Sequence, residues 1–242
     1  MIKADLHTHT IACTHAYSTI SEIASYAKKT NIEMVAITDH TPGGPDSPHI
    51  WHFRNMQVVP RIIDGVKILR GAETNIMNPK GEVDLPKDML EKLDIAIASF
   101  HNIPNAETGT KEEHTNAYIN LIKNPNIDIL GHTGSTRFEY DIDTVIKTAK
   151  EYNKIIEINN ATFNVRKQNI PNCIEIAKKC KQYGVLVAVN SDAHICYQIG
   201  NYDNALGLLK EIEFPTELII NTSAQKVIDH LNTRTNKEKI VF

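Results

Sequence analysis

The sequence is poor in the features that mark membrane, secreted and disulfide-rich proteins. Its 242 residues include no apolar run of 18 or more, which excludes a membrane-spanning helix. The first residues form no apolar signal stretch, and the four cysteines are too sparse for a disulfide framework. We therefore expect reduced thiols and a cytoplasmic location.

A surplus of charge of one sign is also missing. The chain has 26 basic and 29 acidic residues, a net charge of -3, and no basic tract rich in aromatic residues. This balance argues against a general nucleic-acid-coating protein, although a nuclease with a local basic patch stays open. The residues that are present, 41% hydrophobic and 23% charged with no linker or low-complexity tract, fit a single globular domain over residues 1–242.

Strand-like and helix-like segments alternate along the chain. Short apolar runs predict seven buried strands, near residues 2–7, 34–38, 66–77, 95–100, 127–130, 154–159 and 185–189. Capping-box patterns at 19–22 and 110–113 predict helix starts, as does Asp143, and Gly184 predicts a helix end. Further helices are expected at 174–183, 205–212 and 224–231, and a further short strand at 217–220. The alternation indicates parallel βαβ units.

Side chains that can bind a metal stand at the carboxyl ends of six of the seven predicted strands. His7 and His9 lie two apart on the first strand, so both point to the same side. The ends of the other five carry His40, Glu73, His101, His132, and Asp192 with His194, whereas the sixth strand ends in Asn159-Asn160. Strand ends converge on one face of a barrel but spread along an edge of an open sheet. We therefore predict a closed or nearly closed barrel with fewer than eight units.

With His15 from the first loop, the predicted metal ligands number nine: His7, His9, His15, His40, Glu73, His101, His132, Asp192 and His194. Each alone has an ordinary explanation, such as a loop hydrogen bond or a helix cap, but that does not explain their recurrence at strand ends. A catalytic zinc ion keeps three protein ligands and an open position, so nine ligands suggest three divalent ions. Imidazoles with two carboxylates suit zinc, and also manganese or iron, whereas magnesium prefers oxygen ligands. Asp5 and Asp39 are interpreted as partners that orient imidazoles.

These motifs resemble those of the polymerase and histidinol phosphatase (PHP) superfamily. In chain order, the similar segments are His7-Thr8-His9, Thr38-Asp39-His40, Glu73, His101, Gly131-His132 and Ser191-Asp192-Ala193-His194. The stretch 51–56 and the compact length resemble the YcdX-type phosphatases within it. The resemblance implies a distorted seven-stranded (β/α)7 TIM-like barrel with a trinuclear metal site at the carboxyl ends of its strands. One departure is Thr133, where relatives usually have proline, and it puts the shape of the substrate in question.

The family pattern further implies which ligands share a metal. The first ion would be held by His7, His9, Glu73 and Asp192, the second by His101 and His132 with Glu73 bridging, and the third by His15, His40 and His194. The resemblance also implies a homo-oligomer, although the sequence indicates no interface.

The charge of such a site predicts its chemistry. Three divalent ions outweigh two carboxylates and a bridging hydroxide, so the site favours an anion such as a phosphate ester. The metal-bound hydroxide, held by Glu73, His101, His132 and Asp192, would attack the phosphorus atom. We therefore expect a metal-dependent phosphatase, a hydrolase acting on phosphoric ester bonds, with a small phosphomonoester as substrate. Candidate substrate contacts are Arg137, Arg166 and His52, with a solvated surface role open for both arginines.

Two alternatives stay open. One keeps the chemistry and changes the substrate, as in a histidinol-phosphate phosphatase or a nuclease like the PHP domains of polymerases. The other is a non-catalytic metal-binding module, which would take up metal without turning over any phosphoester. Neither a membrane nor nucleic acid is an expected partner.

Overall fold

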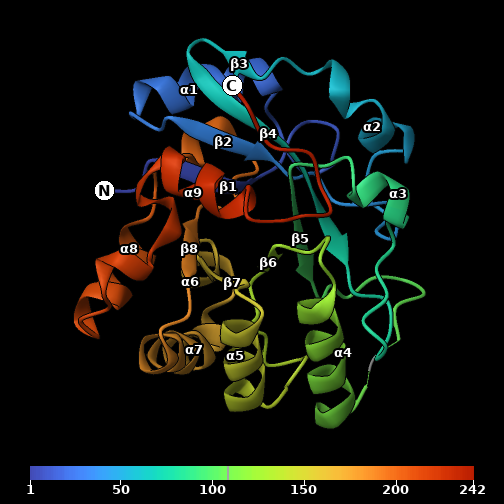
Figure 1. Ribbon diagram of the computed structural model, residues 1–242, viewed down its shortest axis with the longest axis vertical. Coiled ribbons are helices and arrows are strands. Elements are labelled where there is room, and N and C mark those ends of the chain that lie inside the picture. Colours follow the sequence, from blue (N-terminus) through green and yellow to red (C-terminus); the bar gives the residue numbers. More distant parts are fainter. Residues whose placement is uncertain (108) are drawn as a thin grey trace.

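Seven parallel strands lie side by side in chain order and nearly close into a barrel (Figure 1). The computed structural model describes residues 1–107 and 109–242. The strands are β1 (Ala4–Thr8), β2 (Met34–Ile37), β4 (Val66–Asn75), β5 (Ile95–Ser99), β6 (Ile129–Leu130), β7 (Ile155–Asn159) and β8 (Val187–Asn190). A two-residue strand, β3 (Ile62–Ile63), pairs antiparallel with the start of β4. The predicted seven-stranded barrel is therefore confirmed.

Two hydrophobic clusters, one inside the barrel and one outside, explain why the strands read as continuous apolar runs. The inner cluster takes alternate residues from the strands: Ala4, Leu6, Met34, Ala36, Leu69, Ile95, Ile97, Ile129, Ile155 and Ala188. The outer cluster lies between the strands and the surrounding helices and includes Ile23, Ile37, Ile68, Leu121 and Ile176. Because both faces of each strand are buried, polar side chains are left to the strand ends.

Side-chain hydrogen bonds, those of Asn221 foremost, join the first and last strands of the barrel. Among the described residues, β1 and β8 share no continuous ladder, only a bridge between Thr8 and Ala193. The Asn221 amide fills the gap: its Nδ2 donates to Ala4 O (2.8 Å) and Val189 O (2.6 Å), and its Oδ1 accepts from Val189 N (3.1 Å). These bonds stand in for the strand pairing that β1 and β8 lack.

Helices surround the barrel and follow the predicted start and stop signals. The longer ones are α1 (Ile20–Lys29), α4 (Lys111–Lys123), α5 (Ile142–Glu151), α7 (Ile170–Tyr183), α8 (Asp203–Glu211) and α9 (Ala224–Leu231). Short helices are α2 (Trp51–Arg54), α3 (Lys87–Leu90) and α6 (Thr162–Val165). Both predicted capping boxes form, at Thr19 and Thr110, and Gly184 ends α7 with a positive φ of 66°. No helix in the described part of the chain is long and apolar enough to cross a bilayer.

Most predicted bounds differ from the structure by only one or two residues, but two helix starts and one predicted strand need correction. The cap of α5 is Asp141 rather than Asp143, because the Asp141 carboxylate accepts from Thr144 N at 3.1 Å. Helix α7 begins at Ile170, four residues earlier than expected, with a proline in its first turn. The strand predicted at 217–220 is reduced to one parallel bridge between Ile219 and Val187. Two 3₁₀ turns, Thr216–Leu218 and Ile220–Thr222, form on either side of it and deliver Asn221 to the barrel gap.

The amino-terminal end of the barrel is closed by the last part of the chain. Side chains of α9 and the tail join the inner cluster, among them Ala224, Val227, Leu231 and Ile240. Figure 1 shows α9 lying against β1. The opposite end, where the strands finish, is consequently the end that polar side chains can line.

Candidate metal centre

Glu73, near the end of β4, lies between two groups of imidazoles. Its Oε1 is 2.9 Å from His132 Nε2 and 3.3 Å from His101 Nε2. Its Oε2 is 2.9 Å from His40 Nδ1 and 3.2 Å from His7 Nε2. One carboxylate thus faces ligand-type nitrogens with both oxygens, the geometry that a bridge between two cations requires.

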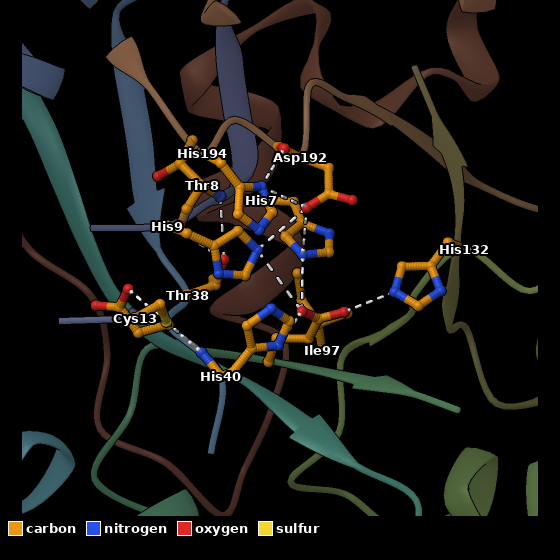
Figure 2. A network of polar contacts seen from close by, with 12 residues as sticks. His7, Thr8, His9, Cys13, Thr38, His40, Ile97, His132, Asp192 and His194 are labelled. Atoms are coloured by element: carbon orange, nitrogen blue, oxygen red, sulfur yellow. Dashed lines mark hydrogen bonds and ion pairs between the residues drawn. The ribbon is translucent and has the colours of Figure 1, made fainter. Parts of the chain in front are cut away.

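The second carboxylate, Asp192, faces the histidines of the first strand. Its Oδ1 is 3.1 Å from His9 Nε2 and 3.5 Å from His7 Nε2. Asp192 follows β8 and the histidines end β1, so the near-closure of the barrel brings them together. Figure 2 shows the side chains converging from these strand ends. Asp192 has a φ of 55° and His132 a φ of 24°, both in the left-handed region that non-glycine residues seldom adopt.

A third group of histidines lies nearer to solvent. His15 Nε2 is 2.7 Å from His194 Nε2, and the His15 and His40 rings are stacked with centroids 5.3 Å apart. His15 is 46% exposed, and its Nδ1 is 2.8 Å from Asp46 Oδ2. All nine predicted ligands are therefore brought to the same end of the barrel.

The polar atoms of this cluster fit a bound cation. His7 Nδ1 is 2.7 Å from a carboxylate oxygen of Glu157, which places the proton on Nδ1 and a lone pair on Nε2. That Nε2 faces Glu73 Oε2, and both buried atoms lack a hydrogen-bond partner among the described residues. If both atoms were bare acceptors 3.2 Å apart, each would cost about 1–3 kcal/mol. A proton on Nε2 or a metal cation between the two atoms removes that cost.

The two carboxylates and His9 are in the forms that bind a metal, whereas His7 must give up a proton. Burial alone would lower the pKa of His7, but the carboxylates of Glu157 and Glu73 raise it well above its usual range. Burial would raise the pKa of Glu73, but the neighbouring imidazoles, His7 foremost, hold it well below its usual range. Asp192 is likewise buried, and His7 and His9 keep its pKa well below the ordinary value. Burial and the nearby His40 lower the pKa of His9 to about 3. Ionised carboxylates and a neutral imidazole are the forms that bind a metal.

Glu157, in the middle of β7, was missed by sequence reasoning. Its Oε1 bonds His7 Nδ1, and its Oε2 accepts from His132 N at 2.7 Å. Asn75 was missed too, and its Oδ1 lies 2.7 Å from His101 Nδ1. For Glu157 a signal was available in the sequence: it is a carboxylate inside a strand predicted to be buried on both faces, where a charge without a partner is costly.

The candidate substrate contacts lie in three different places. Arg166 lines a cavity of about 310 Å³ together with the ligand cluster, and its Nη2 is 3.7 Å from Asp192 Oδ2. Arg137 is exposed, lies over the Phe138 ring and is absent from the described lining of that cavity. His52 lines a separate depression beside α2.

The two aspartates predicted to orient metal-binding imidazoles, Asp5 and Asp39, have other partners in the structure. Asp39 lies 3.1 Å from His52 Nε2 and accepts from Thr10 N at 2.7 Å, so the imidazole beside it is not one of the nine. For Asp5 the prediction is wrong: its carboxylate bonds Ser191 and the Tyr202 hydroxyl, and fixes the loop that carries Asp192.

Comparison with known proteins gives consistent matches. Residues 5–168 match the family model described as PHP domain. A protein named probable phosphatase from Acetivibrio thermocellus is 45% identical, over 98% of this chain and 97% of its own. Another of that name, from Caldanaerobacter subterraneus subsp. tengcongensis, is 47% identical, over 96% of this chain and 92% of its own.

Solved structures share the fold. The histidinol phosphate phosphatase of Lactococcus lactis, complexed with zinc, L-histidinol and phosphate, superposes with a TM-score of 0.64 at 19% identity, covering 88% of this chain and 94% of its own. A chain of an archaeal ribonuclease P with mature tRNA gives 0.61 at 15% identity, covering 95% and 90%. At these identities the likeness shows the fold alone.

Proposed function

The chain belongs to the PHP domain family, and on that premise we propose that it hydrolyses small phosphomonoesters with three divalent metal ions as cofactors. Family membership and near full-length relatives named probable phosphatases make it a phosphoric ester hydrolase. The observation that carries the finer proposal is Glu73, whose two oxygens face different sets of imidazoles while Oε2 has no hydrogen-bond partner among the described residues.

Three metal positions account for the nine ligands. The first would be held by His7, His9, Glu73 and Asp192, the second by Glu73, His101 and His132, and the third by His15, His40 and His194. The Nε2 of His101 is aimed at Glu73 because its Nδ1 bonds Asn75 Oδ1. Zinc fits this imidazole-rich set best, with manganese or iron as alternatives. Such ions supply Lewis-acid charge and lower the pKa of water to about 7.

The chain itself would bind and orient the phosphate ester. Arg166 supplies the only arginine or lysine side chain in the described lining of the ligand-cluster cavity, and its Nη1 is buried without a partner among the described residues. A guanidinium placed there can donate to phosphoryl oxygens and stabilise the charge of the transition state. Pro45, Asn102 and Ile103 line the same cavity and would contact the leaving group. A cavity of about 310 Å³ suits a small ester.

Phosphate release from a panel of monoesters tests this proposal. The protein would be supplied with zinc, manganese or iron and assayed between about pH 6 and 9, on either side of the water pKa expected near 7. The matched variants are Arg166→Gln, expected to lower kcat/KM by about 10-fold or more, and Arg137→Gln, expected to leave it unchanged. Cleavage of diesters but no monoester would favour the nuclease alternative. Release from neither, by metal-loaded protein, would replace the enzyme by a metal-binding module.

A further inference from the structure

Glu157 connects two of the proposed metal positions although it belongs to neither. It lies in β7, its side chain is fully buried, and its oxygens contact one ligand of each position, His7 and His132. We propose that Glu157 is a positioning residue that selects the metal-binding tautomer of His7 and holds the backbone of His132. The inference rests on the metal positions of the proposed function.

Four N–H groups converge on this one carboxylate. Oε1 lies 2.7 Å from His7 Nδ1 and accepts from Asn190 Nδ2 at 2.9 Å. Oε2 accepts from His132 N at 2.7 Å and from Asn159 Nδ2 at 3.2 Å. Only an ionised carboxylate offers that many acceptor sites without a proton of its own.

The surrounding amides fix the direction of these bonds. A backbone N–H can only donate, and Asn190 Oδ1 accepts from Leu6 N at 3.1 Å. Asn159 Oδ1 accepts from Thr162 N at 3.2 Å in the same way. Each asparagine therefore turns its NH₂ group towards Glu157. With three fixed donors around it, the carboxylate is held as an acceptor, and the fourth partner, His7 Nδ1, carries the proton.

The consequence for His7 is a defined tautomer. With the proton on Nδ1, the Nε2 lone pair points at Glu73 Oε2 and Asp192 Oδ1, 3.2 Å and 3.5 Å away. The other tautomer would put a hydrogen on Nε2 and block coordination at the first position. When a metal binds, Glu157 thus keeps the proton of His7 on Nδ1 and leaves Nε2 as the nitrogen that can coordinate.

The consequence for His132 concerns its backbone. Its φ of 24° is unusual for a residue with a side chain, and its N–H is held by Glu157 Oε2. That bond supports the conformation from which the ring reaches Glu73. Since one carboxylate supports a ligand of each of two positions, its loss should weaken both rather than one.

The test compares Glu157→Gln with Asp128→Asn in zinc titrations against a competing chelator. Each carboxylate oxygen of Glu157 now accepts from two donors. Glutamine replaces one of these oxygens by an NH₂ group, so two of the four donors would face another donor. We expect zinc affinity to fall by about 10-fold or more, at two sites per chain. Asp128 is a buried carboxylate that directly precedes β6, so it lies at the amino-terminal end of the barrel, away from the proposed metal positions. Like Glu157, it bonds several donors. Its variant should bind zinc as the wild type does.

A spectroscopic readout addresses the tautomer itself. In zinc-loaded protein with ¹⁵N-labelled histidine, the His7 resonances should show a protonated Nδ1, and Glu157→Gln should shift or abolish that signal. If the Gln variant does not fold, Glu157→Asp serves, since it keeps the charge but retracts the oxygens by one methylene and should also bind zinc more weakly. Unchanged zinc affinity in the folded Glu157 variant, or an equal loss in Asp128→Asn, would overturn the inference. Neither readout needs turnover, so a missing phosphatase activity would refute the proposed function alone.

Discussion

The Oε1 atom of Glu73 lies 2.9 Å from Nε2 of His132, although the two residues are 59 positions apart and end different strands. The other oxygen of the same carboxylate faces His40 and His7. A negative charge shared between two groups of imidazoles is the feature on which the proposed two-metal bridge depends.

Glu73→Gln keeps the size of the side chain and removes that charge. We expect at least one metal ion per chain to be lost and phosphate release to fall by about 100-fold or more, because two cations then share no anion. Metal analysis measures the loss of bound ions, and circular dichroism checks that the variant keeps the fold. Glu151→Gln, at the exposed end of α5, is the control and should keep metal and rate. A Glu73→Gln protein with full metal and wild-type turnover would contradict the bridge.

His15→Ala separates metal binding from packing. The side chain is 46% exposed, so its removal should change the free energy of unfolding by no more than about 0.5 kcal/mol. We nevertheless expect weaker binding of the third metal and slower turnover. His49→Ala removes an exposed histidine whose Nδ1 accepts from Trp51 N, and it should alter neither metal binding nor turnover. Wild-type turnover with undiminished metal content in His15→Ala would remove His15 from the ligand set.

Asn221→Ala tests how the barrel is closed. The substitution leaves Ala4 O, Val189 O and Val189 N without their side-chain partner in a fully buried position. At about 1 kcal/mol or more for each buried unsatisfied group, we expect a loss of roughly 3 kcal/mol in the free energy of unfolding, measured with urea. Asn201→Ala, on the surface, should cost far less. Equal stability of the two variants would show that β1 and β8 hold together without the amide.

Lys154 should make stability depend on pH at the amino-terminal end of the barrel. Burial lowers its pKa from 10.5 to about 8. Between these values the unfolded chain binds a proton that the folded chain does not, so the stability of the wild type relative to Lys154→Met should rise with pH across that window. The full rise is about 3 kcal/mol at most, and the difference should be flat below pH 8. A difference that falls with pH from 8 to 10.5 would contradict the assigned shift.

The barrel and the convergence of the nine candidate ligands at one end of it were predictable because each signal was local in the sequence. Buried parallel strands read as apolar runs, and a histidine or carboxylate just beyond such a run must lie at the barrel end. The capping boxes at Thr19 and Thr110 were equally local and are confirmed.

Glu157 and Asn221 could not be recognised in the same way. Glu157 lies inside a strand. Its proposed positioning role depends on the register that turns its side chain into the barrel, and on the residues that it meets there from β1 and from the end of β6. Asn221 lies in a turn whose role follows from the gap between the two end strands. Arg137 and Arg166 read alike in the sequence, and only the path of their loops puts the second one in the ligand-cluster cavity. Such relationships exist only once the chain has closed on itself.

The most direct measurement follows bound zinc and phosphate release together while zinc is added to metal-free protein. The account predicts no hydrolysis of phosphomonoesters without metal, activity that rises with loading, and a plateau at three zinc ions per chain. A plateau at one ion per chain would contradict the three-metal centre. Fully loaded protein that releases no phosphate from any monoester would contradict the function itself.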